Sequence, residues 1–199
     1  MTIIDHPSPN HSERKTGVCV DTVLIHHTGT DGHGNWGDLS ALWTLCSPKA
    51  GVSAHYLVKQ SGDVLRLVPE HLKAWHAGKG CLPWETCEPY DVNHRSIGIE
   101  VVNPGDGQTP FTEAQYAALE WLVSDVVRRL GWDVVHMRAE GREWMLRQGA
   151  AFLASADPSK EITYGYVLGH RDVAPGRKTD PADNFDWGRI RKALAGGVA

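Results

Sequence analysis

The sequence contains no apolar run long enough to span a bilayer, which takes about 20 consecutive apolar residues. The N-terminal stretch, MTIIDHPSPNHSERK, lacks the basic start and apolar run that mark a secretory signal peptide. We therefore expect cytoplasmic synthesis, without a signal peptide or a membrane anchor.

Charge of one sign is not concentrated anywhere in the chain. The 20 basic and 24 acidic residues give a formal net charge of -4 and are scattered along the sequence. Proteins that bind nucleic acid usually gather lysine and arginine on one face. The pattern therefore argues against nucleic acid as a partner. Separately, we expect the protein to be a monomer.

Cysteine is sparse. Cys19, Cys46, Cys81 and Cys87 are too few and too irregularly spaced for a disulfide framework, and no CxxC pair suggests structural zinc. Free thiols in a reducing cytoplasm are the favoured interpretation. A bond between Cys81 and Cys87 after export stays open as an alternative.

Length and composition indicate one globular domain. The chain has 199 residues, of which 41% are hydrophobic and 22% charged, as in ordinary soluble proteins. Residues 1–17 are polar and contain two prolines, so they predict a lead-in segment before a single catalytic domain at 18–199. Residues 137–160 show no clear pattern and predict an insertion, with a short helix at 143–153.

Hydrophobic periodicity predicts strands and helices in alternation. The turn Ser61-Gly62-Asp63 predicts an antiparallel hairpin, and Thr112 with Gln115 forms a capping box at the start of the clearest helix. The expected strands are 18–25, 55–59, 64–68, 96–102 and 164–168, and the expected helices begin at Asp38 (with Leu39, Leu42 and Cys46 on one face), Thr112 and about Trp187. This order indicates an α/β (α+β) fold with a central mixed β-sheet flanked by helices.

Histidine and tryptophan are abundant, with 11 and 8 residues. Histidine is the commonest side chain for binding zinc and for transferring protons, and tryptophan rings suit sugars. Three polar clusters, His26-His27, Glu100 and 169–181, follow or end predicted strands. A catalytic zinc needs about three protein ligands and one position for water. His26, His170 and Asp180 could supply them, although spacing alone does not establish this.

Five ordered motifs raise the specificity of that hypothesis: VLIHHTGT at 23–30, SAHYLVKQSGDV at 53–64, AWHAG at 74–78, SIGIEVVN at 96–103 and GHRDVAPGRKTDPADNFDW at 169–187. Together they resemble the N-acetylmuramoyl-L-alanine amidase type 2 family. That family contains phage endolysins, bacterial muropeptide-recycling amidases and animal peptidoglycan-recognition proteins. The resemblance runs from residue 18 to about 194 and implies the peptidoglycan-recognition-protein-like fold.

The resemblance also implies roles for individual residues. His26, His170 and Asp180 would hold Zn2+, Glu100 would transfer the proton and Lys178 would stabilise the oxyanion. Some phage relatives carry a tyrosine where this chain has Ala54, which assigns the proton transfer to Glu100 here. His76 and Trp75 would contact the substrate. A packing role stays open for Trp75 and His55, and a structural role for His76.

The implied activity is that of a zinc amidohydrolase that cuts the amide between the muramic acid lactyl group and L-alanine. Its partners would be peptidoglycan or muropeptides. A bacteriolytic phage endolysin acting on the cell wall is favoured slightly, because the 137–160 insertion looks extra beside compact recycling enzymes. The alternatives are a cytoplasmic amidase that recycles 1,6-anhydro-muropeptides and a non-catalytic peptidoglycan-binding module. The intact metal set argues against the binding module.

Overall fold

The computed structural model describes residues 1–31, 33–82, 92–132, 134–137 and 164–196. The strands are β1 (Ile3–Asp5), β2 (His11–Glu13), β3 (Thr22–His27), β4 (Tyr56–Val58), β5 (Val64–Arg66), β6 (Leu72–Ala74), β7 (Ser96–Val101), β8 (Val134–Met137) and β9 (Tyr164–Gly169). The helices are α1 (Asp38–Cys46), α2 (Glu113–Arg129), α4 (His170–Val173) and α5 (Trp187–Gly196), with a 3-10 turn η1 (Val92–His94). Apart from Met137, the predicted insertion at 137–160 lies outside the described residues.

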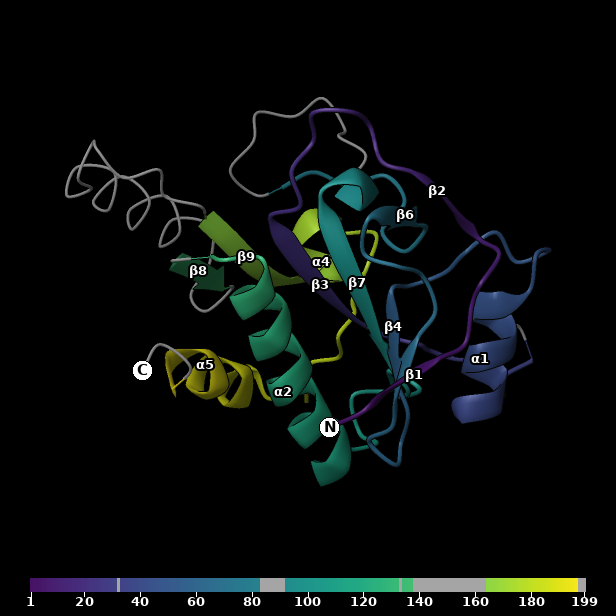
Figure 1. Ribbon diagram of the computed structural model, residues 1–199. Coiled ribbons are helices and arrows are strands. Elements are labelled where there is room, and N and C mark those ends of the chain that lie inside the picture. Colours follow the sequence, from purple (N-terminus) through teal and green to yellow (C-terminus); the bar gives the residue numbers. More distant parts are fainter. Residues whose placement is uncertain (32, 83–91, 133, 138–163, 197–199) are drawn as a thin grey trace, which may run out of the picture.

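Within the described ranges, seven strands form the central sheet in the order β1-β5-β4-β7-β3-β9-β8. Five adjacent strands of this sheet, β4, β7, β3, β9 and β8, run parallel to one another. On its other side, β4 forms an antiparallel hairpin with β5. Helices cover the sheet (Figure 1). The mixed sheet flanked by helices, and the hairpin within it, are confirmed.

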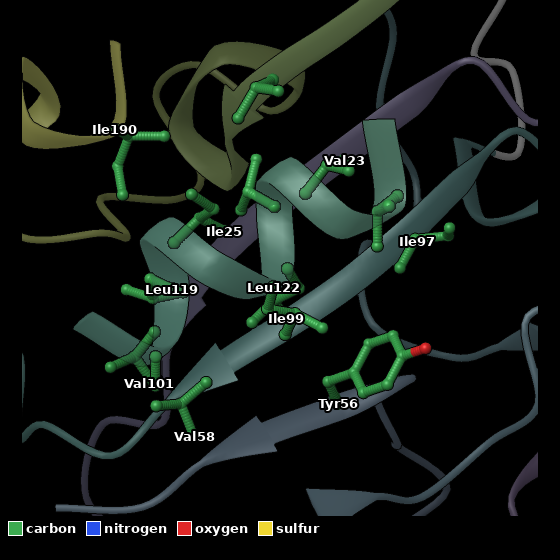
Figure 2. Packing of buried hydrophobic residues seen from close by; sticks show 14 of the residues in the cluster. Val23, Ile25, Tyr56, Val58, Ile97, Ile99, Val101, Leu119, Leu122 and Ile190 are labelled. Carbon is green, nitrogen blue, oxygen red and sulfur yellow. The ribbon is translucent and has the colours of Figure 1, made fainter. Parts of the chain in front are cut away.

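One face of the sheet packs against α2 and α5. Because side chains alternate between the two faces of a strand, every second residue of β3, β4 and β7 enters this core. Figure 2 shows these side chains meeting those of the two helices. The labelled residues are Val23, Ile25, Tyr56, Val58, Ile97, Ile99, Val101, Leu119, Leu122 and Ile190.

The intervening residues of the same strands point to the opposite face. There Leu57 and Leu65 pack against Ala41 and Leu45 of α1, and a second cluster joins Leu24 and Leu168 to Val173 of α4. His26 and Glu100 belong to this set by alternation. The polar site therefore lies on the face that α2 and α5 leave free.

The N-terminal segment at 1–17, expected as a lead-in, contributes two strands. β1 lies parallel to β5 at the edge of the main sheet, and β2 pairs with β6 in a two-stranded antiparallel sheet. Ser8 and Asn10 are buried, and their side chains donate hydrogen bonds to the carbonyls of Leu45 and Ser47. This segment thus holds the end of α1.

The helices predicted at Asp38, Thr112 and about Trp187 are present, whereas the one predicted at 143–153 lies outside the described residues. The buried face of α1 differs from the expected one. Leu39 is 84% exposed, whereas Ala41 and Leu45 are buried. A helix of nine residues that contains leucines at 39, 42 and 45 fits more than one apolar stripe, so the sequence could not select the right one. The capping box that opens α2 is confirmed in both of its hydrogen bonds. None of the helices in the described ranges is long and apolar enough to cross a bilayer.

The cysteines divide into two groups. Cys19 and Cys46 are free thiols, as expected. Cys81 is disulfide-bonded, so the free-thiol interpretation is wrong for this residue. Cys87 lies outside the described residues.

Replacement of Leu119 tests the core between α2 and the sheet. Leu119 is fully buried, so Leu119→Ala leaves a cavity and should lower the free energy of unfolding by about 2–5 kcal/mol. Urea unfolding followed by circular dichroism measures this. The control is Leu39→Ala, at the 84% exposed position on α1, which should change the same quantity by less than about 0.5 kcal/mol. Equal losses in both variants would contradict the assigned core.

Candidate active site

His26 lies near the end of β3, in the middle of the sheet. It is 1% exposed and stands in register with Glu100 of the parallel strand β7. The other neighbour, β9, runs directly into α4, whose first residue is His170. Parallel strands end at the same edge of a sheet, so residues far apart in the sequence meet here.

Asp180 completes a compact group with the two histidines. Its Oδ2 atom lies 2.8 Å from His26 Nδ1 and 3.0 Å from His170 Nδ1, and the two Nδ1 atoms are 3.0 Å apart. All three side chains are buried. The backbone also holds Asp180 in place, because its carbonyl accepts a hydrogen bond of 2.9 Å from the Arg171 amide.

The donor atoms of this group fit a metal ion. Two imidazole nitrogens and one carboxylate oxygen are a usual protein ligand set for catalytic zinc. Burial lowers the pKa of His26 to about 4, despite the opposing effect of Asp180, so the ring is neutral and able to coordinate at neutral pH. Burial alone would raise the pKa of Asp180, but its close contacts with His170 and His26 outweigh it and keep the carboxylate ionised.

Glu100 lines the cleft beside this group. Its Oε2 atom is buried and makes no hydrogen bond. Burial, together with the negative charge of Asp180, raises the pKa of Glu100 well above its usual range, and Lys178 opposes the rise. A carboxylate with a raised pKa and a free oxygen is suited to proton transfer.

A cleft of about 350 Å³ opens over the group. Every residue that the sequence analysis assigned to the site lines it: His26, Trp75, His76, Glu100, His170, Lys178 and Asp180. The cleft also reaches α1 and the neighbouring Arg177. The structure therefore brings together all of the candidate residues, which span the chain from β3 to the loop after α4.

His76 and Trp75 differ in what they contact. His76 Nδ1 lies 3.0 Å from His26 Nε2, and His76 Nε2 lies 3.2 Å from the hydroxyl of Ser96. Trp75 turns its indole N–H towards Ser12 of β2, at 3.2 Å. Both residues lie on the cleft wall, but each polar atom of these two rings already has a partner within the protein.

The groups that surround the histidines were not predicted from the sequence. The Ala77 carbonyl lies 2.9 Å from His170 Nε2, and Asn93 Oδ1 accepts hydrogen bonds from the amides of residues 76 and 77. A backbone carbonyl has no signature in a sequence. Asn93 lies in η1, within a loop region that shows no periodicity.

Comparisons with known proteins identify the family of this chain. The family model described as N-acetylmuramoyl-L-alanine amidase matches residues 16–183. The chain is 30% identical to 1,6-anhydro-N-acetylmuramyl-L-alanine amidase AmpD of Enterobacter cloacae, over 94% of this chain and 88% of that protein. The chain thus belongs to the N-acetylmuramoyl-L-alanine amidase family, and it is a zinc-dependent amidohydrolase.

Two solved structures share the fold. A crystal structure of an AmpD derivative gives a TM-score of 0.67 at 23% identity, covering 96% of this chain and 94% of that one. The amidase AmiD from E. coli gives 0.58 at 26% identity, covering 92% and 65%. That AmiD structure contains the substrate anhydro-N-acetylmuramic acid-L-Ala-D-gamma-Glu-L-Lys.

The buried His55, which packs edge-on against His76, predicts a pH dependence of stability. Burial, reinforced by the nearby charge of Arg14, lowers the pKa of His55 to about 3. Below pH ~6.5 the His55 side chain therefore binds a proton in the unfolded chain but not in the folded chain. The free energy of unfolding consequently decreases as the pH is lowered. At pH 5 this residue alone should cost about 2 kcal/mol relative to neutral pH.

Urea unfolding in chelator at pH 7 and pH 5 measures the effect, and His55→Leu should reduce the difference between the two pH values. His11→Leu, at an exposed histidine of β2, should leave that difference as it is in the wild type. An unaltered pH dependence in His55→Leu would refute the assignment.

Proposed function

We propose that this amidase hydrolyses soluble 1,6-anhydro-muropeptides, with zinc held by His26, His170 and Asp180. The observation that supports the metal site most directly is the approach of three buried donor atoms to within 3.0 Å of one another. When bound there, zinc would polarise the substrate carbonyl and lower the pKa of water towards neutrality.

Glu100 is the proton-transfer residue in this proposal. Its free Oε2 atom lies at the cleft, where it can take a proton from the attacking water. The raised pKa makes the carboxylate a stronger base than an exposed glutamate, and the proton that it takes from water can then pass to the leaving L-alanine amine. Glutamate is the residue available for this step, because buried Ala54 carries no proton-transfer group.

Lys178 supplies positive charge to the lining of the cleft. Its charge lowers the pKa values of both His26 and Glu100. A cation fixed near a developing oxyanion stabilises the transition state more than the neutral amide. Lys178 would therefore stabilise the tetrahedral intermediate, while Trp75 and His76 form part of the wall beside the substrate.

The relatives support the recycling role better than the endolysin role that the sequence analysis favoured. The Enterobacter relative, at 30% identity over nearly the whole chain, is named for 1,6-anhydro-N-acetylmuramyl-L-alanine. The substrate in the AmiD structure is also an anhydro-muramic acid peptide. Cytoplasmic turnover of wall fragments is thus the proposed role, and lysis of intact wall is the competing one.

Paired variants test the assignments of metal ligand and base. His170→Ala and Asp180→Ala should lose both stoichiometric zinc and amidase activity, because each removes one of three donors. Glu100→Gln should retain zinc and lose about 10²- to 10⁴-fold in kcat, as expected when a proton-transfer group is removed. Metal content by mass spectrometry and release of free stem peptide provide the two measurements. A Glu100→Gln enzyme of wild-type activity would exclude this base.

A comparison of two substrates tests the biological role. The wild-type enzyme should turn over soluble anhydro-muropeptide with a kcat/KM roughly tenfold or more above that for intact sacculi. Glu100→Gln provides the background for each substrate. Equal or faster turnover of sacculi would reject the recycling role and favour an endolysin, without affecting the assignment of the zinc ligands.

A further inference from the structure

Both ring nitrogens of His76 are engaged within the protein. Nδ1 lies 3.0 Å from His26 Nε2, and Nε2 lies 3.2 Å from Ser96 Oγ. Ser96 Oγ in turn donates a hydrogen bond of 2.8 Å to the Val92 carbonyl. These contacts form a continuous series of hydrogen bonds from η1 to His26 of β3.

The hydrogen bond from Ser96 to the Val92 carbonyl fixes the direction of the other hydrogen bonds in this series. The Ser96 hydroxyl hydrogen is used on the Val92 carbonyl, so its oxygen is the acceptor for His76 Nε2–H. A neutral imidazole has one N–H, so His76 Nδ1 accepts from His26 Nε2–H. His26 Nδ1 is then left without a hydrogen, and its lone pair faces His170 and Asp180.

Ala77, the residue after His76, fixes the tautomer of His170 in the same way. The Ala77 carbonyl can only accept, so His170 Nε2 carries the hydrogen and Nδ1 is free. Arg177 donates to that same carbonyl at 2.9 Å, which fixes its position from the other side. Two consecutive residues thus set the tautomers of both histidines.

Contacts with Asn93 and Gly98 hold residues 76 and 77 in place. Asn93 Oδ1 accepts from the amides of Ala77 at 2.8 Å and His76 at 3.3 Å, and Asn93 is buried. The His76 ring lies directly on Gly98 of β7, where an added Cβ would come within 2.4 Å of the ring. Any larger residue at position 98 would therefore displace the ring, which shows that its position is set by packing as well as by hydrogen bonds.

We infer that His76 is a positioning residue for the metal ligand His26, acting through the hydrogen bond between His76 Nδ1 and His26 Nε2. It holds His26 in the tautomer that can coordinate, and Ala77 does the same for His170. This role differs from the substrate contact that the sequence resemblance implied for His76. The inference rests on the proposed zinc site. Partners of this kind typically change metal affinity about 10- to 100-fold when they are removed.

Zinc affinity tests this role separately from activity. His76→Leu removes the acceptor and should raise the zinc dissociation constant about 10- to 100-fold, measured by competition with a chelating dye. His76→Asn places an oxygen where Nδ1 lies and should restore the affinity to within a few-fold of wild type. The visible absorption of bound Co2+ should weaken or shift in the leucine variant and recover with asparagine.

The matched control is His11→Leu, the same change at an exposed histidine of β2 opposite Ala74, and it should leave zinc affinity unchanged. Unfolding in chelator shows whether each variant folds. Should His76→Leu not fold, Ser96→Ala keeps the His76 ring but removes the acceptor of its Nε2–H, together with the hydrogen bond to the Val92 carbonyl, and should still weaken zinc binding several-fold.

Two possible results distinguish a failure of the positioning role of His76 from a failure of the proposed zinc site. Wild-type zinc affinity in His76→Leu, with a raised KM, would overturn the positioning role and restore the substrate contact. Weak zinc binding by the wild type itself, unaffected by His170→Ala, would instead refute the proposed zinc site.

Discussion

The parallel register of three central strands is the constraint on which the site depends. β3 lies between β7 and β9, and this arrangement sets His26 beside Glu100 and brings His170 to the same edge of the sheet. Side chains alternate along a strand, so a shift of β3 by one residue would turn His26 into the core beneath α2. The apolar residues of that core therefore secure the position of the polar ones on the other face. Stability and chemistry are linked through the same six residues of β3.

Burial makes the polar face costly unless each polar group finds a partner. His26 and His170 meet this requirement through the segment at 76–77. Their Nδ1 atoms converge with Asp180 on the proposed metal position. Glu100 does not meet this requirement, since one of its carboxylate oxygens has no hydrogen bond. A buried carboxylate without a partner lowers stability, and such groups tend to lie at functional sites. The cost falls at the position where proton transfer is proposed, which links the energetics of the fold to the reaction.

Local patterns in the sequence predicted the parts of the fold that local interactions determine. The hairpin after β4, the capping box of α2 and the alternation along β7 all follow from residues close together in the chain. The pairing of β2 with β6 and the buried face of α1 were not predicted, because they depend on contacts between distant segments. For the site, the ordered motifs identified the histidines and carboxylates. Ala77 and Asn93 were missed because a carbonyl and a loop asparagine carry no pattern of their own.

The N-terminal segment shows how far such unpatterned contacts extend. Arg14, just after β2, donates hydrogen bonds of 2.9 Å and 2.7 Å to the carbonyls of Asn93 and His94 in η1. Asn93 in turn holds the amides of the segment that contacts both site histidines. Burial lowers the pKa of Arg14 to about 10, which still leaves the side chain charged at neutral pH, and charged donors make the stronger hydrogen bonds. A residue from the expected lead-in is thus three contacts away from the site histidines, so the order of the metal site depends on a part of the chain that lies outside every motif.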